Sequence, residues 1–204
     1  MTRWLPSIFV LLLVGVGFVW RAWLQRRRFG SWGIHLFATG RWVQHVRETA
    51  LVGLLLLLAL QAAWAATESP MLTALRLPFA GGPFSTWLGS VVALGGIALM
   101  VRAQLDMGAS WRVGFDEQAR PGLVTSGLYR CSRNPIYLGL FVGLFGFLLV
   151  VPTWLSLAMF VATLLAIARQ VRDEEAFLSR TYGDDYDSYA ALVGRFVPRI
   201  GLRS

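Results

Sequence analysis

A short polar stretch that runs directly into an apolar segment carries residues able to bind an anion. Residues 127–139 read Gly-Leu-Tyr-Arg-Cys-Ser-Arg-Asn-Pro-Ile-Tyr-Leu-Gly. Asn134 is a favourable N-cap residue and Pro135 suits the first helical position, so we expect a helix to begin there. A helix start presents unpaired N–H groups, and Arg130 and Arg133 lie beside it, so this junction could bind a carboxylate or a phosphate. The alternative is that both arginines are ordinary cytoplasmic anchors of a membrane helix.

A pair of carboxylates follows the last apolar run of the chain. Glu174 and Glu175 precede a tail in which acids alternate with aromatics. A carboxylate near a membrane surface is costly unless a cation pairs with it, and Arg130 or Arg133 is the obvious partner. Consecutive helical residues point about 100° apart, so we expect one glutamate at most to face the junction. The other should be a surface charge or a partner of Arg172. The alternative for both glutamates is that they are solvated surface charges where the helix leaves the membrane.

Composition indicates that these charged groups belong to an integral membrane protein. Of the 204 residues, 56% are hydrophobic and only 15% are charged, and the mean hydropathy is +0.57. All 19 basic residues are arginine and lie mostly at the ends of apolar runs, so we expect membrane lipids as partners and no nucleic acid. With Cys131 as the single cysteine and only His35 and His45, neither a disulfide nor a metal site is expected.

The apolar runs predict an all-α, polytopic fold with about five membrane-embedded helices. They cover residues 4–24, 49–66, 84–105 and the two halves of 135–169. The first is too long for a signal-peptide core and is expected to be retained. An interfacial segment is expected at 25–48 and an external loop at 67–83.

Pro152 divides the last apolar stretch, and we expect the chain to reverse there because proline disfavours a helix interior. The resulting hairpin would bring the helix start at Asn134 and the exit beyond Arg169 to the same side of the membrane. Only Arg3 and Arg76 fall on the opposite side, together with the N-terminus, and the other 17 arginines share the side of the C-terminus. By the positive-inside rule, the N-terminus is expected outside and the C-terminus in the cytoplasm.

Two motifs resemble the isoprenylcysteine carboxyl methyltransferase family of membrane enzymes, a superfamily with phospholipid N-methyltransferases and thiol S-methyltransferases. The first is Arg133-Asn134-Pro135-Ile136-Tyr137 after a glycine-aromatic-arginine loop. The second comprises Glu174, Glu175, Leu178, Gly183, Tyr186, Tyr189 and Pro198. Together they cover roughly residues 105–200, which suggests an N-terminal membrane region at 1–104 and a catalytic region at 105–204.

The resemblance implies S-adenosylmethionine as methyl donor, bound at the cytoplasmic face by the long loop, the hairpin start and the C-terminal segment. The cofactor residues would be Gly122, Leu123, Val124, Gly127, Tyr129, Arg130, Asn134, Tyr137, Glu174 and Tyr186. Arg133 would hold an acceptor carboxylate, and Glu175, the glutamate that the family pattern favours, would deprotonate a thiol or amine. Asn134 replaces the histidine of many carboxyl-methylating members and cannot act as a base.

The implied acceptor is lipophilic: a prenylcysteine-like or isoprenoid carboxylate, a lipid amine or a thiol. Its tail could reach the site between the third helix, where Gly89, Gly95 and Gly96 allow close approach, and the hairpin. No glycine-rich loop follows a strand, so a Rossmann methyltransferase is excluded. The competing hypotheses are an NADPH-dependent membrane reductase of sterol-reductase type and a non-catalytic membrane scaffold. Binding of S-adenosylhomocysteine or of NADPH would distinguish them.

Overall fold

The computed structural model describes residues 2–37, 42–78, 81–114 and 122–202, and every regular element in these ranges is helical. The first long helix runs from Thr2 to Phe29. It comprises a 3-10 turn, α1 (Leu5–Val14), a π-helical stretch (Gly15–Trp20) and α2 (Arg21–Phe29). The later helices are α3 (Trp42–Ala66), α4 (Pro70–Ala74), α5 (Pro83–Asp106), α6 (Pro135–Val150), α7 (Trp154–Tyr182) and α8 (Asp184–Leu192).

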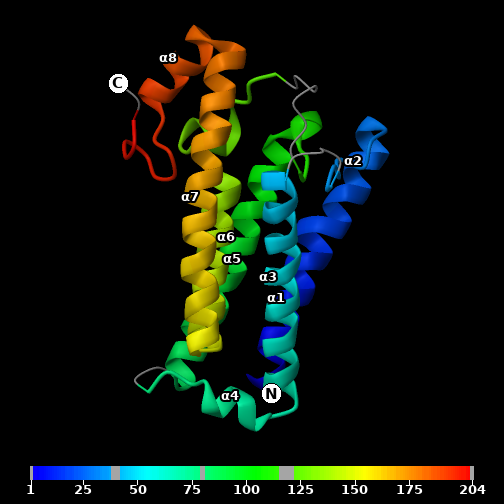
Figure 1. Ribbon diagram of the computed structural model, residues 1–204, viewed down its shortest axis with the longest axis vertical. Helices are drawn as coiled ribbons and strands as arrows, with labels where there is room; N and C mark the ends of the chain where they lie inside the picture. The colour runs from blue at the N-terminus through cyan, green and yellow to red at the C-terminus, as the bar shows by residue number, and fades with distance from the viewer. Residues whose placement is uncertain (1, 38–41, 79–80, 115–121, 203–204) are drawn as a thin grey trace.

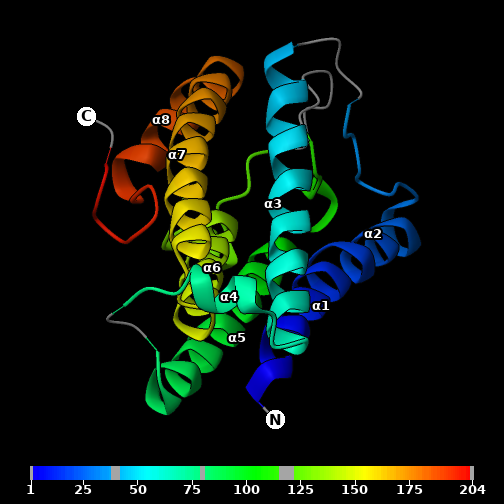
Figure 2. The same ribbon diagram turned by 60° about the horizontal axis from the view of Figure 1, so that its bottom comes forward.

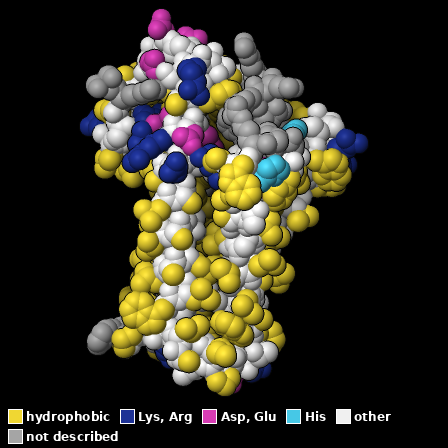
Figure 3. All heavy atoms as spheres, viewed as in Figure 1, with side chains coloured by type: hydrophobic (Ala, Val, Ile, Leu, Met, Phe, Trp, Pro, Cys, Tyr) yellow, Lys and Arg dark blue, Asp and Glu magenta, His cyan; other side chains and the backbone are white. Residues whose placement is uncertain are grey.

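The long helices confirm the expected all-α, multi-pass architecture. Within the described part of the chain, four helices are long and apolar enough to cross a membrane, and α6 is a shorter apolar helix of 16 residues. In Figure 3 hydrophobic side chains cover the middle of the molecule, whereas charged side chains gather over α7 and α8 at one end. The other end carries α4 and the N-terminus (Figure 1).

The helix boundaries differ from those expected, because these helices continue past their apolar cores. The second long helix begins at Trp42 rather than Thr49, and the last extends through Tyr182 rather than ending near Arg169. Most of the described part of the segment expected to be interfacial therefore forms the ends of α2 and α3. The middle of the long loop, residues 115–121, lies outside the described residues, as do residues 38–41.

Glycines bring α5 and α6 into backbone contact. A Cβ atom added at Gly96 would lie 2.2 Å from the backbone nitrogen of Gly143, and one at Gly146 would lie 2.2 Å from that of Ala93. The expectation of close approach is confirmed for Gly89 and Gly96, whereas Gly95 faces open space. Because the two backbones touch, a lipid tail cannot pass between α5 and α6, which corrects the route expected from the sequence.

The reversal at Pro152 is confirmed, and the segment between α3 and α5 is bonded to it. The carbonyl of Pro152 accepts a hydrogen bond from Leu77 N at 2.9 Å, and Trp154 N donates to Leu75 O at 2.9 Å. Thr153 is the N-cap of α7, since its side chain accepts from Ser156 N. The hairpin therefore returns α7 alongside α6, with its charged second half at the end where α6 begins (Figures 1 and 2).

Candidate functional site

Arg133 lies at the centre of a buried polar cluster next to the start of α6. A guanidinium carries five N–H donors, and all of them are engaged. Nε donates to Glu175 at 3.0 Å, one terminal nitrogen to Ala190 O and Val193 O, and the other to Gly201 O and Glu175. Arg133 is only 7% exposed. It joins three separate parts of the chain and has no donor left for a ligand.

Glu175 completes this cluster from α7 and is 5% exposed. Its Oε1 accepts from Arg133, and its Oε2 accepts from Arg195 at 2.7 and 3.1 Å. The expected pairing between Arg133 and the glutamate pair is therefore present. The hydrogen bonds to Glu175 raise the pKa of Arg195 above its ordinary value. Both oxygens of the Glu175 carboxylate are therefore occupied by guanidinium groups.

Asn134 occupies the N-cap position of α6 as expected, but its side chain does not cap the helix. Its Nδ2 donates to Arg195 O at 3.1 Å, and its backbone nitrogen donates to the hydroxyl of Ser132. Arg133 N donates to Gly194 O at 3.0 Å. The two residues that precede α6 are thus bonded to the segment that follows α8.

Glu174 faces a different surface of α7 and does not behave as the expected surface charge. Its Oε1 accepts hydrogen bonds from the Tyr137 hydroxyl and from Gln170 Nε2, both at 2.8 Å. Gln170 also donates to the Tyr137 oxygen at 2.7 Å. The sequence predicted that the outward glutamate would be a surface charge or a partner of Arg172, but the turn of the helix directs Glu174 toward Tyr137 of α6 and the cleft beside α3. Both glutamates are consequently held by side chains, on faces of α7 that are about 100° apart.

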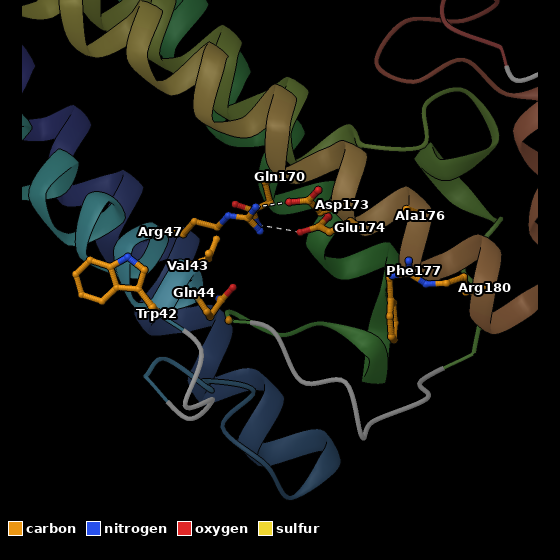
Figure 4. A pocket seen from close by; sticks show the side chains of 11 residues that line it. Trp42, Val43, Gln44, Arg47, Gln170, Asp173, Glu174, Ala176, Phe177 and Arg180 are labelled. Atoms are coloured by element: carbon orange, nitrogen blue, oxygen red, sulfur yellow. Dashed lines mark hydrogen bonds and ion pairs between the residues drawn. The ribbon is translucent and has the colours of Figure 1, made fainter.

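Glu174 lines a cleft of about 550 Å³ between the start of α3 and the second half of α7 (Figure 4). Arg47 reaches across from α3 and forms an ion pair with Asp173. Phe177 points from α7 into the opening. The lining residues are Trp42, Val43, Gln44, Arg47, Gly114, Gln170, Asp173, Glu174, Ala176, Phe177 and Arg180. The cleft thus offers two carboxylates, two guanidinium groups and aromatic rings within one space.

The loop before α6 is fixed by Asp106, the last residue of α5. Asp106 accepts from Leu128 N at 2.9 Å and pairs with Arg102 at 3.0 Å. Tyr189 of α8 donates from its hydroxyl to Tyr129 O at 2.6 Å. Burial, and to a lesser extent Tyr189, raises the pKa of Tyr129 above its ordinary value, so its phenol remains protonated at neutral pH. This turn is therefore held from α5 on one side and from α8 on the other.

The sequence-predicted residues divide into three groups in space. Arg133, Asn134 and Glu175 form the buried cluster, whereas Glu174 lines the cleft and Tyr137 is hydrogen-bonded to it. The third group consists of residues that precede α6 in the chain and one residue of α8: Gly122, Leu123, Val124, Gly127, Tyr129, Arg130 and Tyr186. Arg130 is exposed, whereas Tyr186 is buried and packs edge-to-face on Tyr189.

Sequence reasoning missed most of the cleft. Gln170, Asp173, Phe177 and Arg180 follow the apolar half of α7 at spacings of three and four residues, a period that places them on one helix face. That spacing is a signal available in the sequence. Arg47 and Trp42 of α3 carry no comparable signal, because nothing local indicates that α3 lies across from α7.

Comparison with known proteins connects this geometry to a family. The sequence model described as phospholipid methyltransferase matches residues 84–185. The chain is 32% identical over 79 residues to the protein-S-isoprenylcysteine O-methyltransferase of Schizosaccharomyces pombe, covering 38% of this chain and 34% of that protein. It is 28% identical over 122 residues to the probable protein-S-isoprenylcysteine O-methyltransferase of Oryza sativa subsp. indica. That match covers 57% of this chain and 63% of the Oryza sativa protein.

The matched region runs from the start of α5 to the start of α8 and includes the whole first motif and the second motif as far as Gly183. The chain spans less than two thirds of the length of either relative. The chain belongs to the phospholipid methyltransferase family, among the membrane methyltransferases that resemble the isoprenylcysteine enzymes.

Proposed function

We propose that this protein transfers a methyl group from S-adenosylmethionine to a lipophilic acceptor, with the cleft between α3 and α7 as the cofactor site. The observation that carries the proposal is the mixed set of groups at the cleft, where Glu174 and Asp173 stand beside Arg47, Arg180 and Phe177. Family membership supports the reaction class.

The chemistry of the cleft fits the proposed donor. S-adenosylmethionine carries an ammonium, a carboxylate, an adenine and a sulfonium whose methyl group is electrophilic. Glu174 and Asp173 would bind the cationic groups, Arg47 or Arg180 the carboxylate, and Phe177 or Trp42 the adenine by stacking. The residues of the chain then have to align donor and acceptor and exclude water.

We propose positioning roles for Arg133 and Glu175. Their atoms are occupied by each other, by Arg195 and by backbone carbonyls, so they would act by holding α6, α7 and the C-terminal segment together. Glu174 lines the cleft and is therefore better placed to meet an acceptor. A carboxylate acceptor is already ionised at neutral pH and needs no base, whereas a thiol or amine would give its proton to Glu174.

The acceptor is proposed to reach the cleft from the bilayer between α3 and α7. In Figure 3 a furrow separates these two helices below the charged end. The cleft begins where this furrow ends, with Val43 and Ala176 among its lining residues. Residues 105–204 would form the catalytic region, with α3 of the N-terminal region supplying the other wall of the cleft.

The variant Glu174→Gln tests the cofactor site, because it removes the charge and nearly keeps the shape. A hydrogen bond to a charged group contributes about 1.5–3 kcal/mol, so affinity for S-adenosylhomocysteine or turnover should fall about ten- to hundred-fold. Isothermal titration calorimetry on the detergent-solubilised protein measures the affinity, with NADPH as the competing ligand. Glu68→Gln, at an exposed carboxylate on the opposite end, is the matched control.

Normal binding and turnover by Glu174→Gln would show that the cleft is not the cofactor site. Binding of NADPH instead of S-adenosylhomocysteine would favour the reductase hypothesis, and binding of neither would favour a scaffold.

The proposed orientation places the cleft in the cytoplasm and the N-terminus outside. A reporter active only in the cytoplasm should work when fused after Ser204 and fail when fused before Met1. The reverse pattern would require an external active site.

A further inference from the structure

A buried arginine in the first long helix has no role in the site described so far. Arg21 is 1% exposed and lies directly after the π-helical stretch. Its guanidinium donates to Gln104 O at 3.1 Å, to Gly108 O at 3.0 Å and to Gln25 Oε1 at 2.8 Å, and it stacks on the Trp111 ring at 4.4 Å. No acidic side chain in the described ranges forms an ion pair with it.

The partners of Arg21 explain how a cation can be buried there without a carboxylate. The last carbonyls of a helix lack partners within the helix and carry partial negative charge. Gln104 lies in the last turn of α5, and Gly108 follows its end, so Arg21 caps α5 from another helix. Gln25 continues the contact by donating to Ala109 O at 3.0 Å.

The local geometry of the first helix supports this contact. A π-helical turn shifts the hydrogen-bond register and leaves backbone groups available for partners outside the helix. Gly17 lies in that turn, and its carbonyl accepts from Gln104 Nε2 at 3.0 Å. The first helix and the end of α5 therefore exchange hydrogen bonds in both directions, through Gln104 and through Arg21.

The segment that Arg21 holds leads directly to the cleft. After Gly108 and Ala109 the chain passes Trp111, whose ring packs under the guanidinium, and then Val113. Val113 N donates to Gly33 O at 2.7 Å, and His35 N donates to Val113 O at 2.8 Å. The next residue, Gly114, lines the cleft.

We propose that Arg21 is a positioning residue for the cofactor site, acting through residues 107–114 on the wall of the cleft. This proposal rests on the proposed function in one respect, because the measurement of donor affinity assumes that the cleft binds S-adenosylmethionine. The first long helix lies outside the region that matches the family, and the proposal gives this helix a part in forming the site.

The test compares Arg21→Gln with Arg27→Gln, which removes the same charge from an exposed position on the same helix. Hydrogen-deuterium exchange of the full chain in nanodiscs reports on the 107–114 amides, and calorimetry reports on S-adenosylhomocysteine. In Arg21→Gln the amides of Trp111 and Val113 should exchange about ten-fold faster, and the affinity should fall about ten-fold because several charge-assisted bonds are lost. The kcat at saturating donor should stay within about three-fold. Arg27→Gln should match the wild type in all three.

A second variant covers the case in which Arg21→Gln does not fold. Gln25→Leu removes the bond to Ala109 O and the bond that Gln25 accepts from Arg21, but it leaves the Arg21 bonds to Gln104 O and Gly108 O in place. It should therefore raise exchange in the same segment by a smaller factor and weaken donor binding in the same direction. Unchanged exchange of residues 107–114 in the folded variants would overturn the proposal, as would faster exchange with unchanged donor affinity. A wild-type protein that does not bind S-adenosylhomocysteine would instead overturn the proposed function, while the exchange data would still decide whether Arg21 holds the segment.

Discussion

Replacing Arg133 by methionine should destabilise the protein by about 3–5 kcal/mol, the range for breaking a buried ion pair by removing one partner. The change leaves the carbonyls of Ala190, Val193 and Gly201 without their donor, and it leaves Glu175 with Arg195 as its remaining cation. The C-terminal segment should detach from α6 and activity should be lost with it. Thermal unfolding in detergent, followed by size-exclusion chromatography, measures the loss.

Arg172→Met is the matched control for Arg133→Met. Arg172 is exposed on the half of α7 that carries Glu175. Substitutions at exposed positions usually change the free energy of unfolding by no more than about 0.5 kcal/mol. If Arg133→Met were as stable as this control while activity alone was lost, Arg133 would contact the substrate and our assignment of a positioning role would be wrong.

Replacing Gly96 by leucine should separate α5 from α6. The added Cβ would meet Gly143 N at 2.2 Å, Gly143 Cα at 2.6 Å and Gly139 O at 2.7 Å, and all three atoms are backbone. Overpacking costs about 1–3 kcal/mol where side chains can adjust, and backbone cannot move without displacing the helix. We therefore expect little folded protein, measured as the monodisperse fraction after solubilisation.

Gly95→Leu is the control, because it makes the same glycine-to-leucine change at the neighbouring position of α5. Among the described residues, no atom beyond the neighbouring backbone of α5 itself lies within 4 Å of a Cβ built at Gly95, so leucine would face the surroundings of the protein and raise helix propensity. This variant should express and melt like the wild type. Equal yields of both variants would mean that the α5 to α6 contact is not close-packed.

The sequence predicted the architecture well because the lengths of the apolar runs and the positions of the prolines that end them are local signals. Pro135 marks the start of α6 and Pro152 the turn of the hairpin, and both lie where expected. The pairing of Arg133 with Glu175 was also predictable, because a hairpin must bring its two ends together. The boundaries of α3 and α7 were not, since charged residues can continue a helix beyond its apolar part.

The cleft could be predicted only in part, because it depends on which helices are neighbours. Nothing local indicates that Arg47 lies opposite Asp173, and the family motif does not extend to α3. Helix phase was the other unknown, and it determines that Glu174 rather than Glu175 faces the cleft. The burial of Arg21 was equally hidden, since in sequence it resembles one more arginine near a helix end.

The most direct test of the central claim is transfer of a labelled methyl group. Purified protein in nanodiscs would be incubated with methyl-labelled S-adenosylmethionine and, separately, with a prenylcysteine-type carboxylate, a lipid amine and a lipophilic thiol. We predict that label appears in the organic extract with one of these acceptors, and that one S-adenosylhomocysteine forms for each methyl group transferred. The Glu174→Gln variant should transfer the label about ten- to hundred-fold more slowly. Absence of labelled product with every acceptor, from folded protein that binds no S-adenosylhomocysteine, would contradict the assignment as an S-adenosylmethionine-dependent methyltransferase.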